Sequence, residues 1–125
     1  MNQPRSLRRD RAGGLAVDFA LTATPLLLLV FGTMEVGRML WLQNALNFSV
    51  EAAARCAAID VNNCATSAQI KSYAAASSGS GFASGTFTVT TPACGKQVAA
   101  SYPMSVDIPF AAVSITLTAQ SCYPT

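Results

Sequence analysis

The sequence has 125 residues, of which 51% are hydrophobic and 11% are charged, and its formal net charge is +2. This length leaves room for one membrane segment and one small domain. Half of the eight basic residues lie within the first eleven positions, so the rest of the chain offers no basic patch suited to nucleic acid. The absence of histidine removes the usual base and metal ligand at neutral pH, and we expect no enzyme activity, cofactor, metal or small-molecule substrate.

A basic leader, residues 1–13, precedes a long apolar stretch. Residues 14–34 contain a single charged residue, Asp18. At about 1.5 Å per residue, this stretch would span roughly 31 Å as a helix, which matches the hydrocarbon core of a bilayer. The leader carries four arginines, and the positive-inside rule therefore puts it in the cytoplasm. We expect a single-pass protein of a bacterial inner membrane whose C-terminal part is periplasmic.

Three interpretations of the N-terminal segment are open. A cleaved secretory signal would need a small-x-small site after the apolar run, and residues 30–35 lack a good one. An uncleaved signal anchor would simply remain in the membrane. In the third interpretation the chain is cut between Gly13 and Gly14, which leaves Asp18 as the fifth residue of the mature protein and as the only carboxylate in its membrane segment. That arrangement resembles a type IV prepilin.

The helical pattern continues beyond the apolar stretch. Residues 41–56 contain neither proline nor glycine. Apolar residues recur there at steps of three or four, the helical period: Trp41, Ala45, Phe48 and Ala52. The sequence thus predicts one helix over residues 14–59, with a membrane part at 14–36 and a periplasmic part at 37–59.

Residues 60–125 are predicted to form a small head. The polar stretch 60–63 ends the long helix, and Thr66 or Ser67 can cap a second helix that runs to Ala76. Alternation of apolar and polar residues then predicts three strands, at 86–90, 97–107 and 113–120. The expected fold class is α+β: a long membrane-spanning helix continues into a head with a short helix and an antiparallel sheet of about three strands.

Four cysteines lie on the expected outer side of the membrane: Cys56, Cys64, Cys94 and Cys122. An even number in a small exported domain indicates two disulfides in an oxidising compartment. Cys56 and Cys64 flank the break after the long helix, while Cys94 follows the first strand and Cys122 ends the third. We therefore expect the pairs Cys56–Cys64 and Cys94–Cys122. The spacing lacks a C-x-x-C pair and does not favour a zinc or redox centre.

Several short motifs occur in a characteristic order. They are a basic-Gly-Gly start at 11–14, an acid and a phenylalanine at 18–19, a Pro-Leu run at 25–29, an acid-x-Gly-Arg element at 35–38 and an alanine-rich helix at 52–58. As an ordered set they resemble the TadE-like family, the pilin-like proteins of the tight-adherence (Tad/Flp) pilus assembly system. Residues 100–104 and 115–119 extend the resemblance into the C-terminal half.

The resemblance implies a pilin-like minor subunit, or pseudopilin, that works in pilus assembly. Gly13 and Gly14 would form the processing site of a prepilin peptidase, and residues 14–125 would be the mature pilin-like unit. Asp18 and Phe19 would take part in packing against other pilin-like subunits. The expected partners are those subunits, the peptidase and the inner membrane, and the mature protein could also enter the pilus.

The position of Asp18 leaves two roles open. A carboxylate in an apolar membrane helix costs on the order of 2.5–3.5 kcal/mol when it has no partner. A neighbouring subunit could supply that partner through the amino group that cleavage creates at Gly14. Alternatively, Asp18 lies near the cytoplasmic headgroups and reaches water. A second function class is also open, a membrane-anchored periplasmic scaffold or binding module that never enters a filament.

Overall fold

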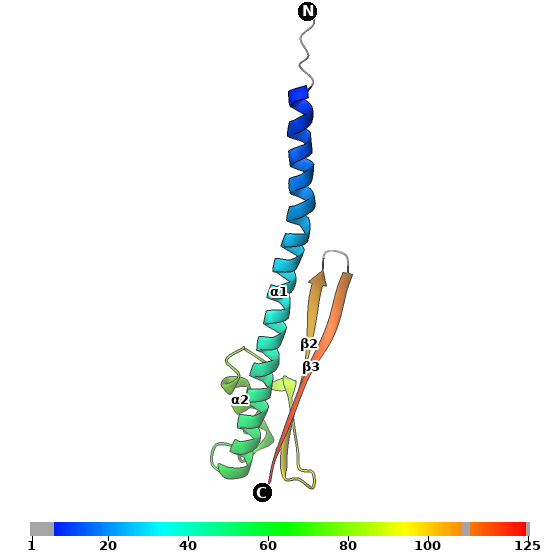
Figure 1. The fold of residues 1–125 in the computed structure, drawn as a ribbon. Coiled ribbons are helices and arrows are strands. Elements are labelled where there is room, and N and C mark those ends of the chain that lie inside the picture. Colours follow the sequence, from blue (N-terminus) through cyan, green and yellow to red (C-terminus); the bar gives the residue numbers. More distant parts are fainter. Residues whose placement is uncertain (1–6, 109–110, 125) are drawn as a thin grey trace, which may run out of the picture. The chain divides into compact units, whose positions relative to one another are not determined.

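The computed structural model describes residues 7–108 and 111–124. Residues 1–6 of the expected leader lie outside the described residues. The elements in chain order are α1 (Leu7–Ile59), α2 (Ser67–Ser77), the 3₁₀ helix η1 (Ser84–Thr86), β1 (Phe87–Thr90), β2 (Lys96–Ile108) and β3 (Ala111–Tyr123) (Figure 1). This is the α+β fold predicted from the sequence, a long apolar helix followed by a short helix and a three-stranded antiparallel sheet.

Helix α1 ends at Ile59, where the sequence predicts its end, but it begins at Leu7 and not at Gly14. The residues before the two glycines are mainly leucine, arginine and alanine, which are good helix formers. Two glycines weaken a helix by about 1 kcal/mol each relative to alanine, but they do not break it as proline does. The helix therefore passes through Gly13 and Gly14.

Contacts within the chain define two units, Met1–Gly37 and Arg38–Thr125, which we call the N-terminal unit and the C-terminal unit. The described part of the N-terminal unit is the first part of α1. From Gly13 to Gly37 its side chains are exposed, except for the half-buried Ala23 and Glu35.

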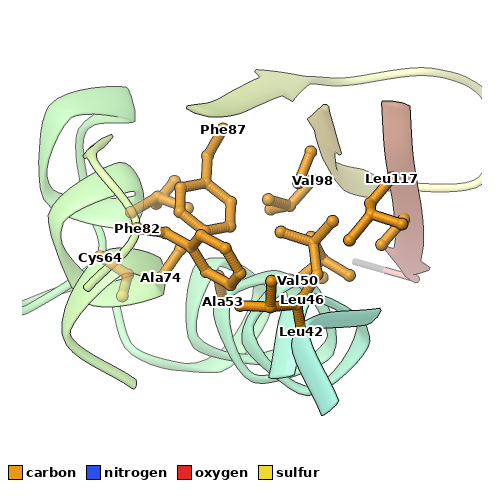
Figure 2. Close-up of a cluster of buried hydrophobic side chains, with 14 of the residues drawn as sticks. Leu42, Leu46, Val50, Ala53, Cys64, Ala74, Phe82, Phe87, Val98 and Leu117 are labelled. Carbon is orange, nitrogen blue, oxygen red and sulfur yellow. The ribbon is translucent and has the colours of Figure 1, made fainter. Parts of the chain in front are cut away.

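The C-terminal unit holds the sheet and the hydrophobic core. The strand order is β1-β2-β3, and both pairs are antiparallel. Buried side chains from α1, α2 and the three strands meet in one cluster, which Figure 2 shows around Leu46, Val50, Phe82, Phe87 and Val98. The aromatic rings of Phe82 and Phe87 pack edge to face, with centroids 6.5 Å apart.

The start of α2 is fixed by side chains. Thr66, one of the two caps predicted, is the N-cap residue. Its hydroxyl oxygen accepts from the backbone N–H of Gln69 at 3.3 Å, and the Gln69 side-chain oxygen accepts from the backbone N–H of Thr66 at 3.0 Å. This capping box satisfies two backbone donors that the helix cannot satisfy itself.

The turn into β2 depends on a glycine. Gly95 donates its backbone N–H to the carbonyl oxygen of Pro92 at 3.0 Å and has φ of 121°. A Cβ at this position would overlap the backbone carbonyl of Tyr123, the last residue of β3. Only glycine therefore lets β2 begin directly beside the end of β3.

Candidate functional site

The expected processing site lies within α1. Gly13 and Gly14 are exposed, and beyond the neighbouring backbone no described atom lies within 4 Å of where a Cβ would stand on either residue. A partner protein can therefore approach the Gly13–Gly14 peptide bond closely. Because adjacent glycines weaken the helix, α1 opens more easily here than in its apolar part.

Asp18 lies one helical turn after Gly14. Residues four apart share a face of a helix, so the carboxylate and the Gly14 nitrogen are on the same side of α1. Among the described residues nothing forms a hydrogen bond or an ion pair with the Asp18 carboxylate. Phe19, the next residue, is also exposed. The structure thus places Gly14 and Asp18 on one side of α1, and Phe19 is exposed at the next position, about 100° further round the helix.

Hydroxyl groups in the apolar stretch are satisfied by their own helix. Thr22 donates to the carbonyl oxygens of Asp18 and Phe19 at 3.0 and 3.1 Å. Thr24 and Thr33 donate in the same way to carbonyl oxygens three or four residues earlier, at 2.7 and 2.8 Å. A hydroxyl bonded in this way can face lipid, where water is not available. These bonds were not predicted, although threonines within an apolar helical run are a sequence signal for them.

Within the described residues, one helical stretch is long and apolar enough to cross a membrane, Gly13–Ile59, whose most apolar window has a mean hydropathy of 2.0. No residue of that window is buried by the rest of the chain. Exposed apolar surface of this extent marks a membrane or protein contact in a stable protein. The helix therefore fits a single-pass membrane anchor.

Two disulfides close parts of the C-terminal unit. Cys56 is bonded to Cys64 with a Cα–Cα distance of 5.8 Å, and Cys94 is bonded to Cys122 with a Cα–Cα distance of 6.3 Å. Both distances lie within the usual range for disulfides. These are the two pairs that the sequence analysis expects.

The loop inside the first disulfide is ordered by Asp60. One carboxylate oxygen accepts from the backbone N–H groups of Asn62 and Asn63 at 3.0 and 3.1 Å, and the other accepts from the Asn63 side-chain amide at 2.8 Å. These hydrogen bonds, led by that of the Asn63 side chain, lower the pKa of Asp60 below its ordinary value of 3.8.

An open cleft of about 750 Å³ lies on the C-terminal unit, between the end of α1 and α2. Its lining includes Phe48, Glu51, Arg55, Ile59 and Tyr73. The cysteine in its wall belongs to a disulfide, so the cleft offers no thiol and no nucleophile beside a base. Within residues 7–108 and 111–124, no group of three histidine, cysteine or acidic side chains is placed to hold a metal.

The family model for the TadE-like protein matches residues 13–55. No curated protein and no solved structure matched the chain. The family match begins at Gly13, includes Asp18 and Phe19, and ends in the last turns of α1. It confirms the resemblance drawn from the sequence motifs. TadE-like proteins are pilin-like proteins associated with the Tad pilus, a structural and non-enzymatic kind of protein.

Proposed function

We propose that this protein is a pilin-like minor subunit, a pseudopilin, of the Tad/Flp pilus assembly system. One observation carries the proposal: α1 is mostly exposed and largely apolar from Gly13 to Gly37, while the same helix continues into a disulfide-closed C-terminal unit. The exposed part needs lipid before assembly and other apolar helices after it. The family match over residues 13–55 supports this reading, because it covers that part of α1.

In this proposal, residues 1–13 are a cytoplasmic leader and residues 14–125 form the mature subunit. Residues 14–36 cross the inner membrane. Residues 37–59 carry the helix into the periplasm, where residues 60–125 form the head. The four arginines of the leader and the two disulfides support this orientation, because basic residues favour the cytoplasmic side and disulfides form in the oxidising periplasm.

A prepilin peptidase would cut between Gly13 and Gly14. Cleavage creates an amino group at Gly14 and makes Asp18 an acid near the positive end of the helix dipole, which favours the carboxylate. The amino group of a neighbouring subunit would then pair with Asp18 as the helices pack side by side. This pairing would offset the cost of a carboxylate in the apolar segment and would give the subunits a common axial register.

The alternative function is a membrane-anchored periplasmic scaffold or binding module that stays outside any filament. The C-terminal unit favours it in one respect, because its core and two disulfides are complete without a neighbouring subunit. Such an anchor has no need of cleavage at Gly13. Processing therefore separates the two functions.

The first test is the mass of the protein purified from its native host. We expect a mature chain that begins at Gly14. Gly13→Val should block cleavage and leave membrane insertion intact, because the basic leader and the apolar run are unchanged. Ala16→Val serves as the control, since it places the same valine side chain away from the cleaved bond. Mature protein that still contains Arg5 to Arg11, in a host with active peptidase, would refute the pilin-like function.

The second test concerns Asp18. Asp18→Ala should insert at least as well as the natural protein, because it removes a charge from the apolar segment. It should nevertheless lose co-purification with the other pilin-like subunits and reduce the number of pili. Asp18→Glu keeps the carboxylate and should retain both. Normal piliation with alanine at this position would show that Asp18 has no role in assembly.

A further inference from the structure

The hairpin of β2 and β3 extends beyond the third strand. β1 pairs with β2 only from Gln97 to Ala100, whereas β2 and β3 remain paired from Lys96–Tyr123 to Ile108–Ala111. Residues 101–108 and 111–118 therefore form a two-stranded ribbon, which we call the arm. A ribbon of two strands is marginally stable by itself and gains from a third strand.

The backbone N–H and C=O groups of the arm alternate between its inner side, toward the paired strand, and its outer edges. In an antiparallel sheet the N–H and C=O groups of successive residues alternate between the two neighbouring strands. Thr88 of β1 donates its hydroxyl to the carbonyl oxygen of Ala99 at 3.3 Å, so the backbone of Ala99 faces β1. Ser101 and Pro103 lie two and four residues after Ala99. Their backbone groups therefore point to the same side as those of Ala99, away from β3.

Two independent features agree with this alternation. Pro103 has no N–H and could not occupy a position that donates to β3. Thr118, which pairs with Ser101, must face away from β2, and its carbonyl oxygen indeed accepts from the Gln43 side-chain amide of α1 at 2.9 Å. By the same alternation, the backbones of Ala112, Ser114 and Thr116 also face outward from β3.

The two edges of the arm differ in how they are protected. Natural edge strands resist pairing with other chains through charged residues, prolines or a cover. Pro103 interrupts the open edge of β2. β3 has neither a proline nor a charged residue along Ala111–Tyr123, and residues 112–116 are all exposed. Nothing in the described parts of the chain forms a hydrogen bond with the outward groups of Ala112, Ser114 or Thr116.

We infer that the outer edge of β3, at residues 112–116, binds an extended segment of another protein as an added strand. Outward N–H and C=O groups on every second residue have the spacing that matches the backbone groups of another extended chain. Val113 and Ile115, 42% and 37% exposed on one face of the arm, favour a segment with apolar residues at alternate positions. The uncharged edge favours an uncharged segment. This contact is additional to the helix packing of the proposed function.

A second copy of this chain is a poorer occupant. Its β1 edge offers four residues, and its β2 edge carries Pro103. Within the C-terminal unit, β3 runs in the same direction as α1 (Figure 1), so an antiparallel β3–β3 pair would set the two α1 helices in opposite directions. Helices anchored by the same end in one membrane run in the same direction. This argument excludes the antiparallel pair and rests on the membrane anchoring proposed above. A parallel β3–β3 pair would keep the helices aligned, but parallel pairing is less stable per residue.

Site-specific photo-crosslinking in the native host tests the inference. The photoreactive residue p-benzoylphenylalanine is placed in the full chain at Ala112, Ser114 or Thr116, and the adducts are mapped by mass spectrometry. An added strand predicts that each step of two residues on β3 moves the adduct by two residues along one segment of a partner. Adducts on β3 of a second copy, adducts with helical spacing, or no protein adduct would overturn the inference.

A backbone variant provides the matched test. Ser114→Pro removes an outward N–H without removing a hydrogen bond between β2 and β3, whereas Ser114→Ala removes the same hydroxyl and keeps the N–H. We expect the proline variant to lower the crosslinking yield from Thr116 at least tenfold and the alanine variant to leave it unchanged. Equal yields would overturn the inference.

Hydrogen exchange of backbone amides in the unaltered protein tests the same inference without introducing a proline that could disturb folding. The amides of Ala112, Ser114 and Thr116 should exchange more slowly in membranes that contain the complete pilus system than in membranes that contain this chain alone. Equal exchange in the two membranes would overturn the inference. Cleavage after Gly13 is measured in the same samples, so failure of the proposed function is recognised separately.

Discussion

Helix α1 is apolar along most of its length, but its two parts differ in what covers them. In the N-terminal unit Leu15 and Phe31 are 72% and 62% exposed, whereas in the C-terminal unit Leu46 and Val50 are 0% and 1% exposed. Apolar composition is similar in both parts, so the partners make the difference. The C-terminal part is covered by the chain's own sheet and α2, and the N-terminal part requires a covering from outside the chain.

Loss of a phenylalanine should destabilise the C-terminal unit only when the phenylalanine belongs to that unit. Phe87 is fully buried, and Phe87→Ala should lower the free energy of unfolding of the C-terminal unit by about 3–5 kcal/mol. Phe31→Ala removes the same ring from an exposed site and should leave that free energy unchanged. Guanidinium unfolding of the full chain in detergent micelles, followed by near-ultraviolet circular dichroism, measures both. Similar destabilisation by the two changes would contradict the division into two units.

The disulfides should stabilise only the C-terminal unit, and to different degrees. Cys94–Cys122 closes a sequence separation of 28 residues and Cys56–Cys64 one of 8. In the chain-entropy model their loss costs about 3.6 and about 2.5 kcal/mol, because the longer loop restricts the unfolded chain more. Replacing each pair by alanine and measuring unfolding without reductant tests the order. The chain-entropy model would be wrong for this protein if loss of Cys56–Cys64 destabilised it more than loss of Cys94–Cys122.

Threonine should also act differently in the two units. Thr66→Ala removes the N-cap of α2 and should lower the free energy of unfolding by about 1 kcal/mol. Thr22→Ala removes a hydroxyl that only bonds back to its own helix, and it should not change the stability of the C-terminal unit. Thermal unfolding of both variants under the same conditions makes the comparison. An equal shift in Tm would mean that the cap makes no specific contribution.

The smallest effect should be a pH dependence that arises from Asp60. Its pKa is lower in the folded protein, so the stabilisation is complete above the ordinary value of 3.8 and is lost as the pH falls through the folded pKa. The difference in stability between the natural protein and Asp60→Asn should therefore shrink between about pH 5 and about pH 2. Unfolding curves across that range measure it. If the difference in stability between the natural protein and Asp60→Asn grew as the pH fell, a lowered pKa of Asp60 in the folded protein would be contradicted.

Periodicity predicted α1 well but could not say which of its stripes is buried. Trp41 and Phe48 repeat at the helical period, yet both are exposed. The neighbouring stripe that includes Leu42 and Leu46 has the same period and forms the core. In the sequence, two adjacent apolar stripes are equally good candidates for the buried face of the helix. Only the position of the sheet and α2 determines which stripe is buried.

Strand ends were the other part that local sequence could not supply. The prediction for β3 covers 113–120, whereas the strand runs over Ala111–Tyr123. Residues such as Ala111 and Ser121 have little strand propensity, and they are extended because they pair with Ile108 and Val98 of β2. Which backbone groups of β3 point outward follows from this register, and the hydrogen bond from Gln43 to Thr118 agrees with it. The outward edge could therefore not be predicted before the sheet was known. The Gly13-Gly14 pair of the proposed processing site, in contrast, is local and can be recognised in the sequence.

The placement of the disulfides has a consequence for proteolysis of the C-terminal unit. A single cut anywhere from residue 57 to 63, or from 95 to 121, leaves both fragments covalently joined through a disulfide. A cut between residues 65 and 93 separates the chain into two pieces, each with its own bridge. The exposed glycine-rich loop around Gly79 and Gly81 lies in that interval. One nick there would break the covalent link between α1 and the three strands and leave only noncovalent contacts such as the hydrophobic core to hold them together. A nick in the arm would leave both fragments joined by Cys94–Cys122.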